Sequence, residues 1–171
     1  IDRLRETIEI LKKLWTENHA SYDGEYFRLK DATLEPKPLQ KPHPTHWVGG
    51  NSEPIRKVVA EVGDGWIPVL PSPKQLADGI MDISQTMERI GRDHRGLQVA
   101  YGGSGCALIA ENEDLVNRLA EPLIRFMRKP IGESGCLVGT PLQCVQRIEQ
   151  YQKAGAKHIV AGFYDFPSMK G

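Results

Sequence analysis

Short apolar segments alternate with amphipathic helical segments along this chain, and this alternation limits the possible folds more than any other feature. We predict strands at four apolar segments, residues 46–48, 65–70, 97–110 and 157–163. Apolar residues recur every three or four positions between them, which predicts helices, and a further helix precedes the first strand. Strands and helices that alternate in this way form parallel sheets with right-handed crossovers. The predicted fold class is α/β, and periodicity alone fits both a doubly wound sheet and part of a barrel.

Local signals set the expected ends of the helices. Residues 72–75 (Ser-Pro-Lys-Gln) and 140–143 (Thr-Pro-Leu-Gln) both have the capping-box pattern, with proline at the first helical position. Asn51 or Ser52 is expected to cap the helix that follows the first strand. Pro122 lies within the helix expected from about residue 113, so we predict a kink or a break there.

Two further signals interrupt the regular pattern. Asp23-Gly24 lies between two β-prone stretches and predicts a small hairpin within residues 20–35. Glycines at residues 102–105 interrupt the apolar stretch 97–110, which predicts either a bulge near a ligand or a different strand boundary.

Composition excludes several classes of protein. The 171 residues predict a single domain, residues 1–171, and 22 basic side chains balance 22 acidic ones, so nucleic acid is not an expected partner. No apolar run is long enough to span a membrane, and no signal peptide is recognisable. Cys106, Cys136 and Cys144 are odd in number and widely spaced, so we expect reduced, mostly buried thiols in a cytoplasmic protein and no metal site. The start at Ile1 is expected to reflect missing upstream residues.

The turn after the first predicted strand is the strongest candidate for a ligand site. It reads Val48-Gly49-Gly50-Asn51-Ser52-Glu53-Pro54, a strand followed by two glycines, two small polar residues and a helix start. Glycines allow a ligand to approach the backbone closely, and free amides at a helix amino terminus favour a phosphate. The alternative for this segment alone is an ordinary strand-to-helix turn with a capping serine.

Six motifs, in a fixed order and at matching spacing across residues 3–163, resemble the luciferase-like family. They are Tyr22-Asp23-Gly24-Glu25-Tyr26-Phe27, Pro36-Lys37-Pro38, Trp47-Val48-Gly49-Gly50, Ala60-Glu61-Val62-Gly63-Asp64-Gly65-Trp66, Val138-Gly139-Thr140-Pro141 and Ala154-Gly155-Ala156. The family fold is a TIM (β/α)₈ barrel. The resemblance implies that this chain is the C-terminal half of such a barrel, strands 5–8, with the N-terminal half absent.

The resemblance also implies a cofactor site at the carboxyl ends of the strands. Carried over residue by residue, the expected cofactor-binding residues are Gly49, Gly50, Asn51, Ser52, Ile67, Pro68 and Val69. For the last three, packing inside the barrel is the alternative. Members of the family take most catalytic groups from the first four strands, so no catalytic residue is assigned in this chain.

Other candidates are expected to be structural. Trp66 is placed either against the cofactor ring or, at least as well, in the core against a helix. Asp64, between two glycines, is expected to stabilise a turn, and His46 lies at the start of its strand, away from the predicted site. Residues 127–137 are a candidate lid.

The implied activity is that of an oxidoreductase. It would use coenzyme F420 for hydride transfer, or reduced FMN in a monooxygenase reaction, on a small organic substrate. Two alternatives remain at this point: a non-catalytic module that binds flavin or assembles a half-barrel, and a barrel that binds a phosphorylated metabolite. Because an isolated half-barrel leaves sheet edges and apolar surface exposed, we expect a homo-oligomer or pairing with the missing half.

Overall fold

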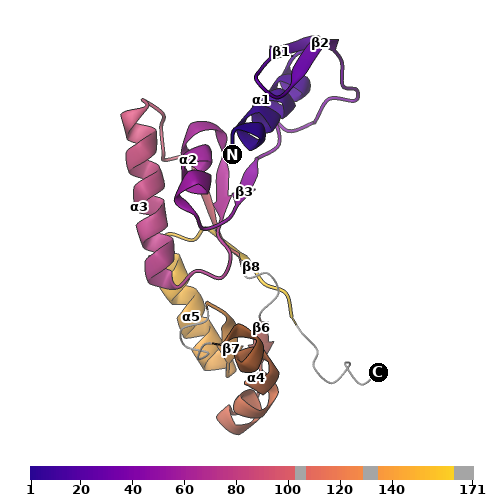
Figure 1. Cartoon of the computed structure of the whole chain (residues 1–171). Coiled ribbons are helices and arrows are strands. Elements are labelled where there is room, and N and C mark those ends of the chain that lie inside the picture. The colour runs from indigo at the N-terminus through magenta and orange to yellow at the C-terminus, as the bar shows by residue number, and fades with distance from the viewer. Residues whose placement is uncertain (103–106, 129–134, 164–171) are drawn as a thin grey trace.

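The computed structural model describes residues 1–102, 107–128 and 135–163 of the chain. The helices are α1 (Asp2–Thr16), α2 (Glu53–Val62), α3 (Pro73–Arg89), α4 (Glu113–Met127) and α5 (Pro141–Lys153). The strands are β1 (Ala20–Asp23), β2 (Arg28–Ala32), β3 (Trp47–Gly49), β4 (Gly65–Ile67), β5 (Gln98–Gly102), β6 (Ala107–Ile109), β7 (Leu137–Gly139) and β8 (His158–Val160). Figure 1 shows their arrangement. No helix in the described ranges is long and apolar enough to cross a membrane.

The main sheet has four strands in the order β3-β4-β5-β8, and every pair within it is parallel. The helix α2 joins β3 to β4, and α3 joins β4 to β5. The predicted α/β class, with parallel strands and helical crossovers, is therefore confirmed. Each strand of this sheet lies within one of the four predicted strand segments or overlaps its end.

One face of this sheet carries the core. The helices α2 and α3 contact each other along their lengths, α5 contacts α3, and in Figure 1 these three helices lie on the same side of the strands. The side chain of Trp66 points from β4 into this layer and is 1% exposed. A Cβ atom at Gly79 in α3 would overlap the Trp66 indole, so glycine makes room for the ring. Trp66 thus packs in the core against a helix, as one of its two predicted placements required.

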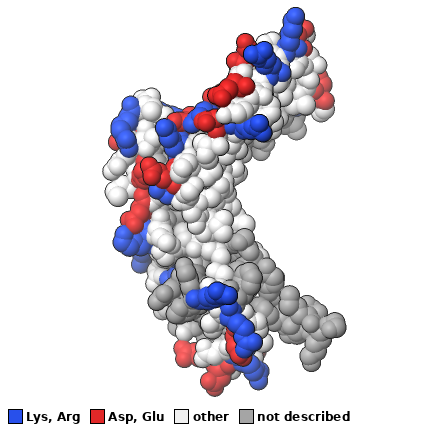
Figure 2. Space-filling view, viewed as in Figure 1, with Lys and Arg blue, Asp and Glu red and all other residues white. Residues whose placement is uncertain are grey.

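The other face of the sheet is largely uncovered. Trp47 of β3 is 39% exposed, and Val160 of β8 is 49% exposed. The Trp47 ring lies over Gly65, where a Cβ atom would come within 2.7 Å of it, and meets the His158 ring edge-on at 5.2 Å between centroids. In Figure 2 the molecule is crescent-shaped, and charged side chains gather on its outer rim and its ends rather than in the hollow. Apolar surface of this kind is what a monomeric sheet normally buries.

A second parallel pair, β6 with β7, favours the second of the two predictions for the glycines at 102–105, a strand boundary rather than a bulge. Residues 97–110 do not form one strand, because β5 joins the main sheet while β6 pairs with β7, and the glycine-rich residues 103–106 between them lie outside the described residues. Glycine in a strand weakens it, which suits a boundary there. A single bridge, Ala107 to Phe163, links β6 to the chain after β8.

The helix α4 corrects one prediction in part. It runs from Glu113 to Met127 without a break, although Pro122 lies inside it. Proline removes only one intrahelical hydrogen bond, and the helix continues on both sides of that gap. Both predicted capping boxes are confirmed, at Ser72 for α3 and at Thr140 for α5.

The predicted hairpin is also confirmed, as the antiparallel pair β1 and β2. The buried carboxylate of Glu6 in α1 holds its turn by accepting hydrogen bonds from the backbone amides of Glu25, Tyr26 and Phe27. This acidic contact fastens the hairpin to α1 and lies away from the main sheet (Figure 1).

Candidate functional site

All seven residues predicted to bind a cofactor come from the carboxyl ends of the neighbouring strands β3 and β4. Gly49 is the register partner of Ile67, and the Gly50 amide donates to the Ile67 carbonyl at 3.3 Å. Their exposure differs. Gly49, Asn51, Ser52 and Val69 are exposed, Gly50 and Ile67 are half-buried, and Pro68 is fully buried. Pro68 therefore packs on the helix side of the sheet, beside Trp66, whereas the other six line one edge of the sheet.

The helix after β3 begins differently from the two helices with capping boxes. In α3 the Ser72 hydroxyl accepts from the Gln75 amide at 3.2 Å, and in α5 the Thr140 hydroxyl accepts from the Gln143 amide at 3.4 Å. Ser52 occupies the same N-cap position in α2, but its side chain makes no capping hydrogen bond. The first turn of α2 thus keeps amides that no capping side chain satisfies.

The two glycines of this turn have separate roles. Gly50 has φ +128°, a backbone conformation that favours glycine. Gly49 has an ordinary φ, and a Cβ atom there would find its nearest neighbour, Ile67, at 3.8 Å. Gly50 therefore shapes the turn, while Gly49 leaves open space above the end of β3.

The Asn51 side chain does not point freely toward a ligand. Its Nδ2 donates to the Val69 carbonyl at 2.7 Å, and its Oδ1 accepts from the Val69 amide at 2.6 Å. The loop after β3 and the loop after β4 are thereby joined into one unit. Sequence reasoning missed this contact, since Asn51 and Val69 are 18 positions apart and no local pattern marks the pair.

The loop after β4 is strained and held from several sides. Leu70 has φ +45°, which is unfavourable for a residue with a side chain. Its amide donates to the Gly102 carbonyl at 2.8 Å, and the Tyr151 hydroxyl donates to the Pro71 carbonyl at 2.7 Å. A strained loop that is held in place in this way is typical of a binding site.

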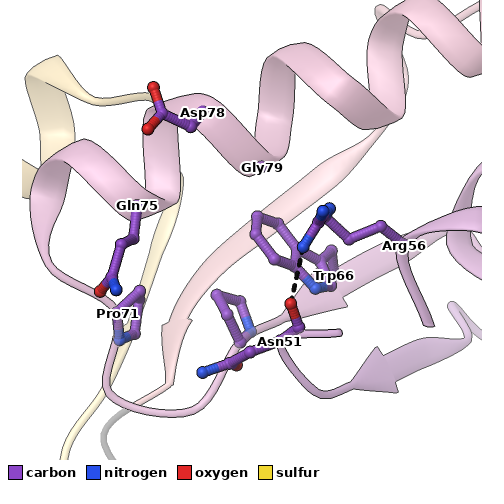
Figure 3. Close-up of a pocket in the computed structure, with 8 residues that line it drawn as sticks. Asn51, Arg56, Trp66, Pro71, Gln75, Asp78 and Gly79 are labelled. Carbon is purple, nitrogen blue, oxygen red and sulfur yellow. Dashed lines mark hydrogen bonds between the residues drawn. The ribbon is translucent and has the colours of Figure 1, made fainter. Parts of the chain in front are cut away.

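A crevice of about 260 Å³ lies beside these loops, between the first turns of α2 and α3 (Figure 3). It is lined by Asn51, Arg56, Trp66, Pro68, Pro71, Gln75, Asp78 and Gly79. Its polar groups already have partners within the protein. Arg56 donates to the Asn51 carbonyl and to Asp82, both at 2.6 Å, and the Trp66 indole donates to the Gly50 carbonyl at 2.9 Å. We interpret the crevice as support for the glycine turn. The sequence had not pointed to Arg56, whose partner Asp82 lies 26 positions away.

The amino ends of the strands carry a charged cluster around Asp64. One carboxylate oxygen lies 3.0 Å from Lys12 Nζ and 3.6 Å from an Arg92 nitrogen. The other accepts from the His46 amide at 3.0 Å and lies 3.2 Å from His46 Nδ1. The group His43, His46 and Asp64 has metal-ligand types within 4.8 Å of one another. However, Lys12 and Arg92 already balance the carboxylate, so a divalent cation would meet two positive charges.

Burial controls the charge of this cluster. Desolvation lowers the pKa of His46 from its ordinary 6.5, and the Asp64 carboxylate acts weakly in the opposite direction. For Asp64 burial raises the pKa, but hydrogen bonds from the His46 backbone and from Lys12 outweigh it, so the pKa lies below its ordinary range. Both residues therefore hold the structure together at the amino ends of β3 and β4, which agrees with the structural roles predicted for them.

The structure describes only some of the residues in two other predicted features, the buried cysteines and the candidate lid. Cys136 and Cys144 are buried thiols, while Cys106 lies outside the described residues. Most of the candidate lid, residues 129–134, also lies outside them. Gly135, at its end, accepts hydrogen bonds from the hydroxyls of Tyr101 and Tyr151.

Comparisons with known proteins fit this architecture. The chain is 26% identical, over 199 aligned positions, to the FMNH(2)-dependent dimethylsulfone monooxygenase of Pseudomonas putida, covering 96% of this chain and 53% of the relative. It is 25% identical to the F420-dependent glucose-6-phosphate dehydrogenase of Segniliparus rotundus, covering 92% of this chain and 53% of the relative. The coenzyme F420-dependent tetrahydromethanopterin reductase of Methanopyrus kandleri has the same fold, with a TM-score of 0.73 at 18% identity, over 94% of this chain and 57% of that one.

The chain thus spans about half the length of the curated relatives it matches. Its parallel α/β fold resembles that of the luciferase-like TIM-barrel enzymes. Residues 1–130 match the model of the family described as luciferase-like monooxygenase, and a match over this much of the chain shows the family. The chain belongs to the luciferase-like monooxygenase family.

Proposed function

We propose that this chain is a single domain, residues 1–171, that forms strands 5–8 of a (β/α)₈ barrel. The four parallel strands β3-β4-β5-β8 would be strands 5, 6, 7 and 8. Three observations support this proposal: the helices lie on one face of the sheet, apolar side chains such as Trp47 and Val160 are exposed on the other, and the relatives are nearly twice as long. A complementary half, supplied by the same protein or by a second chain, would cover the exposed face.

The proposed activity is that of an oxidoreductase that uses reduced FMN or coenzyme F420 on a small organic substrate. The observation that carries it is the glycine turn after β3, where the first turn of α2 lacks a capping side chain and Gly49 leaves open space. The turn lies at the carboxyl ends of the strands, where barrel enzymes bind their ligands. Relatives in the same family are named for FMNH(2) and for F420, which restricts the cofactor to these two.

The residues of this turn suit a phosphorylated cofactor. Backbone amides at Asn51–Glu53 and the Ser52 hydroxyl would hold the phosphate, because the positive end of the α2 dipole favours an anion there. The half-buried Ile67 and the exposed Val69 would contact the ring. When bound, the cofactor supplies hydride transfer or oxygen activation, and the protein orients it and excludes water. We expect the acid–base groups to lie in the other half of the barrel.

A fluorescence titration with FMN, and separately with F420, tests the proposal. It uses this chain and a version extended at its amino terminus to the length of the relatives. Gly49→Trp is the informative variant, because a side chain there fills the open space without strain, the nearest atom lying 3.8 Å from a Cβ. Gly96→Trp is the matched control, since Gly96 also has open space and lies before β5, at the other end of the sheet.

Saturable binding that Gly49→Trp abolishes and Gly96→Trp preserves would support the cofactor site and choose between the two cofactors. If the extended protein binds neither cofactor, the proposal is wrong. Binding of a sugar phosphate alone would then favour a barrel for a phosphorylated metabolite. Cofactor binding without turnover of any substrate would favour a non-catalytic flavin module. The sedimentation coefficient of the 171-residue chain is a separate measurement, which reports whether the chain self-associates.

A further inference from the structure

Asn51 contacts Val69 through both ends of its carboxamide. These two hydrogen bonds resemble the pair that a residue makes with the backbone of the neighbouring strand in a parallel sheet. The bridge between Val69 and Gly102 uses the neighbouring peptide groups, as the hydrogen bond from the Leu70 amide to the Gly102 carbonyl shows. In a parallel ladder the N–H and C=O of Val69 itself then face the opposite side, toward β3. The strand β3 has already ended at Gly49, and the Asn51 side chain takes the place of its next peptide group.

The residues on either side of Val69 indicate that this contact helps to hold the shape of the loop. Val69 lies between Pro68, which is fully buried, and Leu70, which has the unfavourable φ of +45°. A loop with left-handed backbone at a leucine persists only where its surroundings hold it. Gly102 and Tyr151 hold the far side of the loop, through Leu70 and Pro71. On the near side, Asn51 makes both of the hydrogen bonds that the structure gives to the Val69 backbone.

We propose that Asn51 is a positioning residue, whose carboxamide holds the loop after β4 in the shape that the cofactor site requires, rather than a side chain that binds the cofactor itself. The Val69 side chain, 48% exposed at the edge of the site, is the group that Asn51 places. This inference rests on the proposed function and deepens it. It also assigns different roles to neighbouring residues, because both ends of the Asn51 carboxamide are bonded to Val69, whereas the Ser52 side chain makes no capping hydrogen bond.

Two substitutions of Asn51 test the role. Asn51→Leu keeps the approximate volume and removes both hydrogen bonds. Asn51→Asp keeps an acceptor for the Val69 amide, but at neutral pH its carboxylate faces the Val69 carbonyl. Protonation restores a donor toward that carbonyl, so acid should recover the contact in Asn51→Asp and not in Asn51→Leu. Asn112→Leu is the matched control, because exposed Asn112 also bonds to a backbone amide, that of Leu115 at 2.9 Å, but at the start of α4.

The measurements are FMN and F420 affinity by fluorescence, from pH 8 down to pH 4, which reaches the ordinary aspartate pKa of about 3.9, and hydrogen exchange at the Val69 amide. Loss of two hydrogen bonds should weaken the affinity of Asn51→Leu by about tenfold or more at every pH. Asn51→Asp should bind weakly at neutral pH and regain affinity in acid, whereas Asn112→Leu should bind as the unsubstituted protein does. Hydrogen exchange at the Val69 amide should be faster in Asn51→Leu and unchanged in the other variants. The melting temperature of Asn51→Leu should lie near that of Asn112→Leu.

Unchanged affinity in Asn51→Leu, or equal losses in Asn51→Leu and Asn112→Leu, would overturn the positioning role while leaving the proposed function intact. If the unsubstituted, extended protein binds neither cofactor, the proposed function fails instead, and the positioning role fails with it. Fast exchange at Val69 in the unsubstituted protein would remove the contact on which the inference rests.

Discussion

The two ends of the main sheet are built from different interactions. At the amino ends of β3 and β4, Asp64 gathers Lys12, Arg92 and His46 into a charged, part-buried cluster. At the carboxyl ends, the loops are held mainly by bonds to the backbone, and the side chain that joins them is a neutral amide, that of Asn51. Charges that already have partners add stability, whereas uncapped amides and open space can receive a ligand. In this fold the amino ends therefore hold the structure together, and the carboxyl ends are where we propose that the cofactor binds.

The largest expected effect is at the amino ends. Asp64→Leu should lower the free energy of unfolding by about 3 kcal/mol, because it removes the part-buried carboxylate that balances Lys12 and leaves the His46 amide without its acceptor. Urea unfolding measures this loss. Asp93→Leu, which removes an exposed carboxylate paired with Arg95, should change the stability little. A weakened FMN affinity in folded Asp64→Leu would contradict the separation of stability at the amino ends from cofactor binding at the carboxyl ends.

A smaller loss is expected at Gly50. Gly50→Ala should cost about 1–2 kcal/mol, because alanine is strained at φ +128° and its Cβ would lie 3.3 Å from Ile55. Gly49→Ala should be nearly neutral, because its Cβ has room. Thermal unfolding of the two alanine variants measures this difference. Equal losses of stability would show that the two glycines do not have the separate roles inferred for them.

The dependence of stability on pH should come from the amino ends. Burial lowers the pKa of folded His46, so the unfolded state binds more protons once the pH falls below about 6.5. The contribution of neutral His46 is thus present at pH 7 to 8 and is lost in acid, at no more than about 1.4 kcal/mol per pH unit. Urea midpoints between pH 8 and 5.5 should fall, and fall less steeply in His46→Gln. The same slope in both proteins would contradict the assignment to His46.

The smallest expected effects concern the helix caps. Ser72→Ala and Thr140→Ala should each cost about 1 kcal/mol, because each removes a capping hydrogen bond. Ser52→Ala should cost close to nothing in the absence of a ligand, since its hydroxyl caps no amide. It should instead weaken cofactor binding. A loss of stability in Ser52→Ala equal to that in Ser72→Ala would remove the contrast on which the proposed phosphate site depends.

Features that depend on neighbouring residues could be predicted from the sequence. The capping boxes at Ser72 and Thr140, the Asp23-Gly24 hairpin and the alternation of strands with helices all follow from short-range patterns. The glycines at 102–105 left a bulge and a strand boundary equally open, and the pairing of β6 with β7 could not be predicted, because a three-residue strand exists only through its partner. The sequence pattern also correctly placed Gly49 to Ser52 at the carboxyl ends of the strands.

The internal organisation of that edge was beyond sequence reasoning. Asn51 was expected to face the cofactor, yet both ends of its carboxamide are hydrogen-bonded to Val69. Arg56 was not expected at the site, and its contact with Asp82 comes from the packing of α2 against α3. A residue type shows which hydrogen bonds a side chain can make, and only the fold determines which partner receives them.

The placement of Trp47 over Gly65 has an optical consequence. Trp66 is 1% exposed and Trp47 is 39% exposed, so the two indoles already lie in very different surroundings. Anything that covers the open face of the sheet must remove water from Trp47, while Trp66 stays as it is. Tryptophan emission should therefore shift to shorter wavelength on such covering, and Trp47→Phe should abolish the shift. The chain thus carries an intrinsic fluorescent reporter for the arrival of anything that covers this face of the sheet.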